Sequence, residues 1–194
     1  MVPILACSVV TLGIVIERFW TLKSGRVLPP KLLTQIWEWV KNDELDDTRI
    51  QAVHESSPLG RVLAAGLVNR QHSREVMKES IQDTGRHVAH ELERFIGALG
   101  TIAAISPLLG LLGTVLGMIS VFTVITTSGV GNPGQLAGGI SQALITTAAG
   151  LSVAIPTLIF QRLFRAKVET LVMNMEEESL KLVEVLHGER EIGA

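Results

Sequence analysis

The sequence predicts an all-α membrane protein with three transmembrane helices, the second and third extended into the cytoplasm as long amphipathic helices. Two observations carry this prediction. No Asp, Glu, Lys, Arg or His occurs in the 67 residues from Phe95 to Gln161, and this length suits two helical spans of about 20 residues each better than one. Apolar side chains also recur every three or four residues on both sides of this run, as they do on an amphipathic helix.

The first candidate span covers residues 1–16, MVPILACSVVTLGIVI, which carry no charge and end at Glu17-Arg18. A secretory signal peptide would begin with basic residues and end in a small-residue cleavage site, and neither is visible here. The span is short, so we expect its native start to lie further upstream. The single cysteine, Cys7, excludes a disulfide within the chain.

Residues 17–94 are predicted to form a cytoplasmic helical region. Within it, 31–41 (KLLTQIWEWVK) is expected to be a short helix and 42–48 (NDELDDT) an exposed acidic turn. In SSPLG, a serine precedes Pro58, a pattern typical of a capped helix with proline at its first position. The apolar stripe that follows consists of Leu59, Val62, Leu63, Gly66, Leu67, Val76, Met77, Ile81, Val88, Leu92, Phe95 and Leu99.

The second and third spans are predicted at 95–127 and 135–161, joined by SGVGNPG at 128–134, where glycine, asparagine and proline favour a tight loop. The tail, 162–194, is predicted to be a cytoplasmic helix. No turn signal separates either amphipathic stripe from its span, so we expect two long continuous stalks. The stripe of the tail consists of Val168, Leu171, Val172, Met175, Ser179, Leu182 and Leu186.

The distribution of basic residues predicts the orientation. Of the 17 lysines and arginines, twelve lie between Arg18 and Arg94 and five lie from Arg162 onward, while the 128–134 loop has none. By the positive-inside rule, the N-terminus and this loop face the periplasm and the C-terminus faces the cytoplasm of a bacterial inner membrane.

Glycines inside the second span need an explanation, because each interior helical glycine costs about 1 kcal/mol relative to alanine. Gly110, Gly113 and Gly117 are spaced so that they expose a strip of backbone to a neighbouring helix. Small residues also fill 137–151 (AGGISQALITTAAGL) in the third span. We interpret the glycines as helix-packing residues and expect a homo-oligomer, with a compact three-helix monomer as the alternative.

Four polar residues stand out in the spans: Thr114, Gln142, Thr146 and Thr147. A threonine in a membrane helix commonly bonds only a carbonyl of its own helix, and this interpretation stays open for each. A buried amide such as Gln142, however, needs partners or water. Gln142 and Thr146 lie one helical turn apart, so the strip suits either a narrow pore or a docking surface for another chain.

Other function classes have little support in the sequence. A net charge of −2 argues against a nucleic-acid partner. The glycines of 110–117 are not followed by the lysine that a phosphate-binding loop needs, so we expect no cofactor, no catalytic residue and no enzyme activity. His87, His90 and Glu91 have helical spacing that could hold a metal, but a solvated helix face is the expected interpretation, and no metal site is predicted.

Two segments resemble a known family. LGTIAAISPLLGLLGTVLGMISVF (99–122) and GGISQALITTAAGLSVAIP (138–156) are similar to the two signature spans of the ExbB/TolQ/MotA proton-channel family, and IERFWTL at the end of the first span is also similar. The three-span layout resembles the ExbB/TolQ branch, since a flagellar stator subunit has four spans.

This resemblance implies an inner-membrane homopentamer that surrounds the single spans of an ExbD- or TolR-like partner, whose membrane aspartate carries the proton. The complex would drive a TonB- or TolA-like transducer. By position in the family's motifs, Thr114 and Thr147 would line the pore. Gln142 stands where many relatives have a glutamate, and Ser106 where alanine is common. Because Gln142 does not titrate, a non-conducting oligomeric scaffold for a partner complex remains the alternative function.

Overall fold

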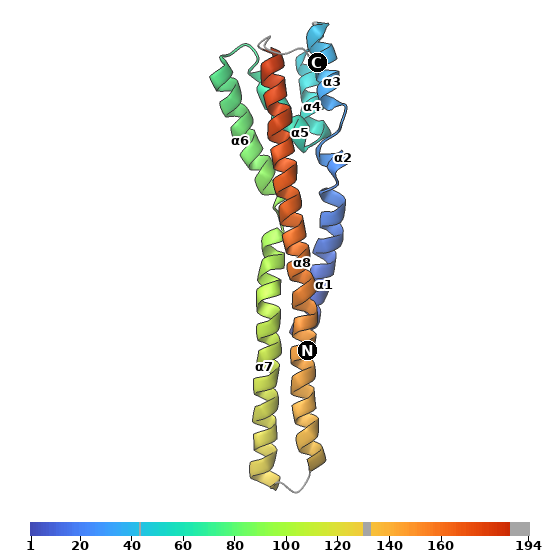
Figure 1. The fold of residues 1–194 in the computed structure, drawn as a ribbon, viewed down its shortest axis with the longest axis vertical. Helices are drawn as coiled ribbons and strands as arrows, with labels where there is room; N and C mark the ends of the chain where they lie inside the picture. The colour runs from blue at the N-terminus through green and yellow to red at the C-terminus, as the bar shows by residue number, and fades with distance from the viewer. Residues whose placement is uncertain (43, 130–132, 187–194) are drawn as a thin grey trace. The chain divides into compact units, whose positions relative to one another are not determined.

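A computed structural model describes residues 1–42, 44–129 and 133–186 of the chain, which form eight α-helices and no β-strand (Figure 1). Three helical segments in this part of the chain are long and apolar enough to cross a membrane. The predicted all-helical membrane fold with three spans is therefore confirmed.

The chain divides into two compact units. The membrane-spanning unit comprises Met1–Glu17 and Phe95–Leu163. The second unit comprises Arg18–Arg94 together with the described residues from Phe164 onward. Each unit has its own core, and α1 and α8 contribute residues to both.

The membrane-spanning unit is built from most of α1 (Val2–Thr21), from α7 (Ile96–Ser128) and from the first part of α8 (Pro133–Leu186). α7 ends where Gly129 adopts a positive φ of 71°, a conformation that glycine adopts without strain. The middle of the loop predicted at 128–134 lies outside the described residues. α8 begins at Pro133, within that predicted loop.

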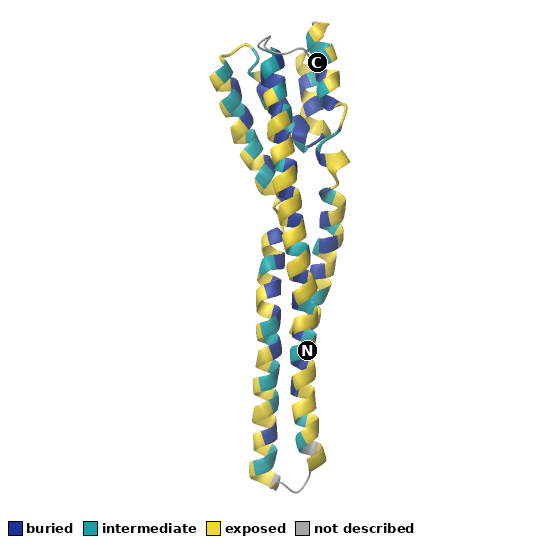
Figure 2. Cartoon of the chain, viewed as in Figure 1, coloured by how far each residue is buried: buried dark blue, intermediate teal, exposed yellow. Residues whose placement is uncertain are grey.

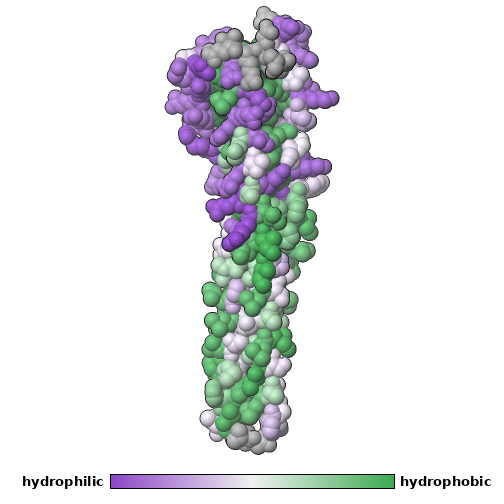
Figure 3. All heavy atoms as spheres, viewed as in Figure 1, coloured by the Kyte–Doolittle hydropathy of each residue, from purple (hydrophilic) through white to green (hydrophobic). Residues whose placement is uncertain are grey.

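Much of the length of these helices is coloured as exposed in Figure 2, and many of the exposed residues are large and apolar. Leu108, Leu116 and Phe122 are 62%, 58% and 59% exposed. On the face drawn in Figure 3, the side chains of these helices are mostly hydrophobic. A water-soluble protein rarely presents so large an apolar surface, whereas lipid covers it at no cost.

The second unit is a small helical domain with an apolar core. The predicted helix at 31–41 is confirmed as α3, and the predicted cap at SSPLG is also confirmed. Ser57 Oγ accepts a hydrogen bond of 3.0 Å from the Gly60 N–H, and Pro58 is the first residue of its helix. Besides the parts of α1 and α8 that belong to this unit, its helices are α2 (Ser24–Val27), α3 (Leu32–Lys41), α4 (Asp47–Ser56), α5 (Pro58–Val68) and α6 (Arg74–Leu92).

In the acidic segment predicted as a turn at 42–48, residues 42 and 44–46 are non-helical, Asp47 and Thr48 are the first residues of α4, and Asp43 lies outside the described residues. Its last residues begin the next helix, because the Asp46 side chain accepts a 2.8 Å hydrogen bond from the Arg49 N–H. An aspartate at this position satisfies one of the free amide groups of the helix start. The segment therefore caps α4 as well as connecting it to α3.

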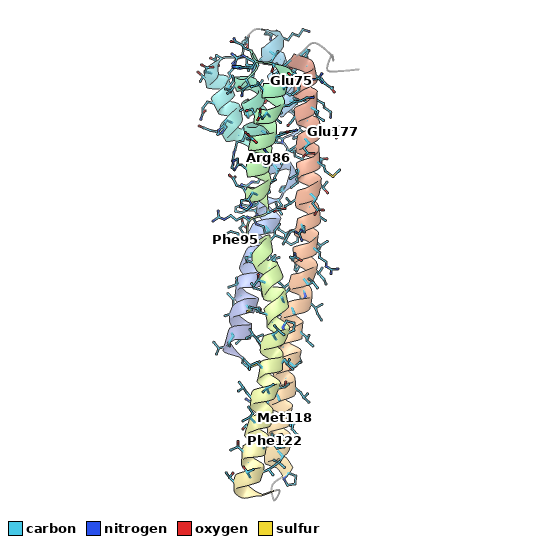
Figure 4. All side chains as sticks on the ribbon, turned by 90° about the vertical axis from the view of Figure 1, so that its left-hand side faces the viewer. Glu75, Arg86, Phe95, Met118, Phe122 and Glu177 are labelled. Atoms are coloured by element: carbon cyan, nitrogen blue, oxygen red, sulfur yellow. The ribbon has the colours of Figure 1, made fainter. Side chains whose placement is uncertain are left out.

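The junction between α6 and α7 differs from the expected continuous stalk. α6 ends at Leu92, residues 93–95 form a turn, and α7 starts at Ile96 (Figure 4). Phe95 has a positive φ of 63°, a conformation that costs a residue with a side chain about 1–2 kcal/mol. Two residues of the predicted amphipathic stripe are exposed and not buried. They are Phe95 at this junction and Val76 in the first turn of α6. The tail of the third span, in contrast, is one continuous helix with its stripe residues buried or half-buried.

Arg18 is attached to the end of α6. Its side chain is only 3% exposed, and Nη1 donates a hydrogen bond of 3.0 Å to the carbonyl oxygen of Leu92. The last carbonyls of a helix have no partner within the helix, and their partial negative charge favours a nearby cation. Arg18 therefore satisfies a helix end that the turn at 93–95 would otherwise leave open.

We predict that Arg18→Met destabilises the protein by about 1–3 kcal/mol, because the Leu92 carbonyl stays buried but loses its donor. The measurement is denaturant unfolding of the purified protein in mild detergent, followed by helical circular dichroism. Arg86→Met is the control, since Arg86 is exposed and pairs with Asp83 on its own helix. Equal stability of the two variants would contradict this role of Arg18.

Candidate functional site: the contact between the second and third spans

The backbones of α7 and α8 approach each other closely at the three glycines that the sequence singled out. A Cβ added at Gly110 would lie 3.0 Å from Thr147 Cα, and one at Gly113 would lie 2.3 Å from the Thr146 methyl carbon. At Gly117 it would lie 2.7 Å from Ala143 Cβ. No side chain larger than hydrogen fits these three positions without movement of α8.

Two glycines of α8 complete the contact from the opposite side. A Cβ at Gly139 would lie 2.5 Å from a methyl carbon of Val121, and one at Gly150 would lie 2.6 Å from the Ser106 carbonyl oxygen. The sequence indicated a general abundance of small residues at 137–151 without identifying these two. Ser106 continues the spacing of Gly110, Gly113 and Gly117 along α7. This spacing was the signal in the sequence that could have identified Ser106 as a fourth packing residue.

The partner of the glycine strip is thus a helix of the same chain. We inferred an oligomer from the need of this strip for a neighbouring helix, and the hairpin of α7 and α8 already meets that need. The strip therefore gives no independent support for a second copy. Homo-oligomer formation remains a proposal that rests on other grounds.

Thr147 joins the two helices through a hydrogen bond. Its Oγ1 donates to the Gly110 carbonyl oxygen over 2.9 Å, across the position where the two backbones are closest. Thr146 is 8% exposed, donates to the Gln142 carbonyl of its own helix at 2.8 Å, and places its methyl group against Gly113. Both residues therefore belong to the α7–α8 contact itself.

Thr114 and Gln142 are not part of this hydrogen-bonded contact. Thr114 Oγ1 donates to the Leu111 carbonyl of its own helix over 2.6 Å, and the residue is half-buried. Gln142 is exposed. The structure therefore brings Thr146 and Thr147 together with the glycines and leaves Thr114 and Gln142 outside that contact.

Ser106 is a buried hydroxyl at the same contact. The residue is fully buried, and its Oγ has no hydrogen-bond partner among the described residues. Its carbonyl oxygen lies beside Gly150, so α8 covers this turn of α7. A serine here adds a buried polar atom to a seam built largely of glycines.

A second hydroxyl contact, which the sequence analysis missed, joins α1 to α8. Thr11 Oγ1 lies 3.3 Å from Thr157 Oγ1, and both residues are buried. Beside them is a cavity of about 180 Å³ that Ser8, Ser152 and Pro156 also line. Single threonines in apolar spans gave no sequence signal for this pairing, because their partner depends on the rotation of each helix.

In the group of His87, His90 and Glu91, which was considered as a metal site, the carboxylate of Glu91 is paired with an arginine. The Glu91 carboxylate receives two hydrogen bonds from the Arg61 guanidinium, of 2.6 and 2.8 Å, and these bonds lower the pKa of Glu91. Within the described residues, no group of three or more His, Cys, Asp or Glu side chains is placed to hold a metal ion. Glu91 serves an ion pair on the surface of the second unit.

Comparison with known proteins gives the family. The model of the MotA/TolQ/ExbB proton channel family matches residues 54–177, which include all of α7 and the α8 half of the contact described above. The chain belongs to the MotA/TolQ/ExbB proton channel family. Its family is thus one of proton channels.

Relatives named after ExbB and TolQ support that branch of the MotA/TolQ/ExbB family, as the sequence resemblance indicated. The ExbB-like 1 biopolymer transport protein of Synechocystis sp. is 33% identical over 84% of this chain and 65% of its own length. An ExbB biopolymer transport protein of Vibrio cholerae is 39% identical over 52% of this chain and 44% of its own. The Tol-Pal system protein TolQ of Pseudomonas aeruginosa is 39% identical over 42% and 36%. The chain spans less than two thirds of each of these relatives.

We predict that Gly113→Ala destabilises the α7–α8 hairpin by about 1–3 kcal/mol, because the new methyl group overlaps the Thr146 side chain, whose Cβ is only 2.7 Å away. Gly97→Ala is the matched control in the same helix, since nothing lies within 4 Å of a Cβ there. The control gains helix propensity and is expected to be as stable as the unaltered protein or more so.

The measurement is unfolding of both variants in mixed detergent micelles by increasing the fraction of denaturing detergent. A Gly113→Ala protein as stable as Gly97→Ala would show that the two backbones are not in direct contact at this position.

Proposed function

We propose that this chain is the channel-forming subunit of a proton-driven motor of the ExbB/TolQ type. The observation that carries the proposal is the combination of membrane-spanning helices with a run from Phe95 to Gln161 that contains no titratable side chain. Proton passage through a membrane needs a titratable group or a chain of water, and ionisable residues normally mark such a path. A carboxyl group supplied by a partner fills this requirement.

The threonine hydroxyls have the chemistry to assist such a carboxyl group. Thr114 and Thr147 each donate their single hydroxyl proton to a backbone carbonyl, of Leu111 and Gly110 respectively. A hydroxyl oxygen that donates its proton still has lone pairs with which to accept a hydrogen bond. The two threonines would therefore accept hydrogen bonds from a protonated partner carboxyl group or from water, without carrying charge themselves.

The partners in this proposal follow the resemblance to ExbB and TolQ. Five copies of the chain would surround the single spans of an ExbD- or TolR-like protein, whose membrane aspartate titrates as protons pass. The motion would act on a TonB- or TolA-like transducer and so support transport through, or the integrity of, the outer membrane. Exposed apolar side chains along α7 and α8, such as Leu112, Val115 and Leu144, offer the surface for such neighbours and for the lipid bilayer.

The proposed topology in the bacterial inner membrane has a periplasmic N-terminus and loop at 128–134 and a cytoplasmic C-terminus. It rests on the distribution of lysine and arginine around the spans. In a Cys7→Ser background, a cysteine replacing Ser128 should react with an impermeant thiol reagent added to spheroplasts, whereas a cysteine replacing the exposed Gln71 should not. The reverse labelling pattern would overturn the orientation.

The position of Gln142 favours one alternative function, that of a non-conducting scaffold. A glutamine gives the third span no titratable side chain, so the chain could hold a partner complex together without passing protons. The two functions differ in their dependence on the proton gradient, which only a channel subunit requires.

For the channel function we predict that Thr114→Val lowers proton flux through the reconstituted complex about ten-fold or more, while the complex still forms. Valine keeps the shape and removes the oxygen that accepts a hydrogen bond. Because Thr114 bonds only its own helix, the substitution leaves the α7–α8 contact in place. Thr123→Val is the matched control, since Thr123 lies in the same helix and also bonds a carbonyl of that helix, that of Ile119.

Two further variants separate pore lining from packing. Thr147→Val should lower both flux and hairpin stability, because it removes the bond to Gly110, and Thr147→Ser should restore both. Gln142→Val should lower flux less than either threonine variant. Flux is measured with a pH-sensitive dye in vesicles that contain the partner protein. Unchanged flux in Thr114→Val and Thr147→Val would refute the pore assignment and favour the scaffold.

A further inference from the structure

Three exposed cations lie together in the second unit, close in sequence to the ends of two spans. Lys23 and Arg26 follow the apolar run of α1, and Lys167 follows that of α8. Lys167 Nζ donates a 2.7 Å hydrogen bond to Ser24 Oγ, so the lysine of α8 is held beside the segment that carries Lys23 and Arg26. We call Lys23, Arg26 and Lys167 the basic cluster.

The basic cluster lacks acidic partners, unlike other cations of this unit. Arg49, Arg61, Arg86 and Lys181 each form an ion pair with a nearby carboxylate. Among the described residues, no carboxylate forms an ion pair with any of the three cluster cations. The cluster therefore presents uncompensated positive charge.

Aromatic side chains border the basic cluster. Trp20 is 68% exposed, and the Arg26 guanidinium carbon lies 4.9 Å from the centre of its ring. Phe19 contacts Phe164 edge to face with ring centres 5.1 Å apart, which ties the end of α1 to α8 a second time. Exposed tryptophan at the end of an apolar span is typical of the interface between lipid and water. An arginine stacked on an aromatic ring keeps the N–H groups at its edge free to donate.

We propose that the basic cluster binds the headgroup of an anionic phospholipid, with its phosphodiester between Arg26, Lys167 and the Ser24 hydroxyl. Guanidinium and ammonium groups donate charge-assisted hydrogen bonds to phosphate oxygens. The glycerol region and the start of the acyl chains would cover Trp20 and Phe19, which are 68% and 60% exposed. A soluble anion would satisfy the cations but leave this apolar surface uncovered.

This inference does not depend on proton conduction. A lipid site at the end of the spans would exist in a channel subunit and equally in a scaffold. Failure of the lipid site would leave the channel proposal intact, and an absence of proton flux would leave the lipid site intact.

The test uses Trp20 as a contact reporter. In this chain of 194 residues, Trp37→Phe and Trp39→Phe leave Trp20 as the remaining tryptophan, since Trp20, Trp37 and Trp39 are the three in the sequence. The protein is placed in vesicles of dioleoyl-phosphatidylcholine and dioleoyl-phosphatidylglycerol, with one of the two brominated to quench fluorescence on contact. Comparison of the two quenching curves gives the relative affinity of the site for the two lipids, independent of changes in tryptophan brightness.

We expect phosphatidylglycerol to be preferred about five-fold or more, as one or two cations near a phosphate would give. Arg26→Gln with Lys167→Gln should reduce the preference to about one. The matched control is Arg86→Gln with Lys181→Gln, which removes the same charge from residues that have carboxylate partners, and it should keep the full preference. Unchanged helical circular dichroism confirms that each variant is folded.

Three results would overturn the proposal: no preference in the unaltered protein, an equal loss of preference in both double variants, or abolition of the preference by 10 mM inorganic phosphate at constant ionic strength. The last would assign the cluster to a soluble anion.

Discussion

The direct contact between the backbones of α7 and α8 is the constraint on which the membrane-spanning unit depends. In lipid, apolar side chains gain nothing by facing each other, so two helices associate through close approach and polar contacts. Glycines on both helices provide that approach, and the bond from Thr147 to the Gly110 carbonyl crosses it at 2.9 Å. The cost of the helical glycines is offset by contacts that no larger residue would allow.

The same contact limits where function can reside. Thr146 and Thr147 serve the hairpin, so a loss of activity on their substitution has two possible physical causes, altered packing and a lost hydrogen-bond acceptor. Thr114 differs, because its hydroxyl is bonded within α7, and we expect its removal to leave the hairpin intact. The hydroxyls of Thr146 and Thr147 donate to backbone carbonyls in this seam and carry no charge. Under the proposed function, the titrating group comes from another protein, because residues 95–161 contain no titratable side chain.

Much of the fold can be predicted from the sequence, because short local patterns of residues determine it. The charge-free run predicts two spans, Ser57 and Pro58 predict a helix start, and the spacing of Gly110, Gly113 and Gly117 predicts a packing face. The remainder depends on tertiary contacts that have no local signal. The break at Phe95, the bond from Arg18 to Leu92, and the choice of α8 as the partner of the glycines are all of this kind.

The most direct test of the central claim is proton flux into vesicles that contain this chain alone, this chain with its single-span partner, or this chain with a partner whose membrane aspartate is replaced by asparagine. The account predicts flux only in the second case, since the spans of this chain contribute hydroxyl groups and no titratable group between Phe95 and Gln161. Flux through the chain alone, or undiminished flux with the asparagine partner, would contradict it.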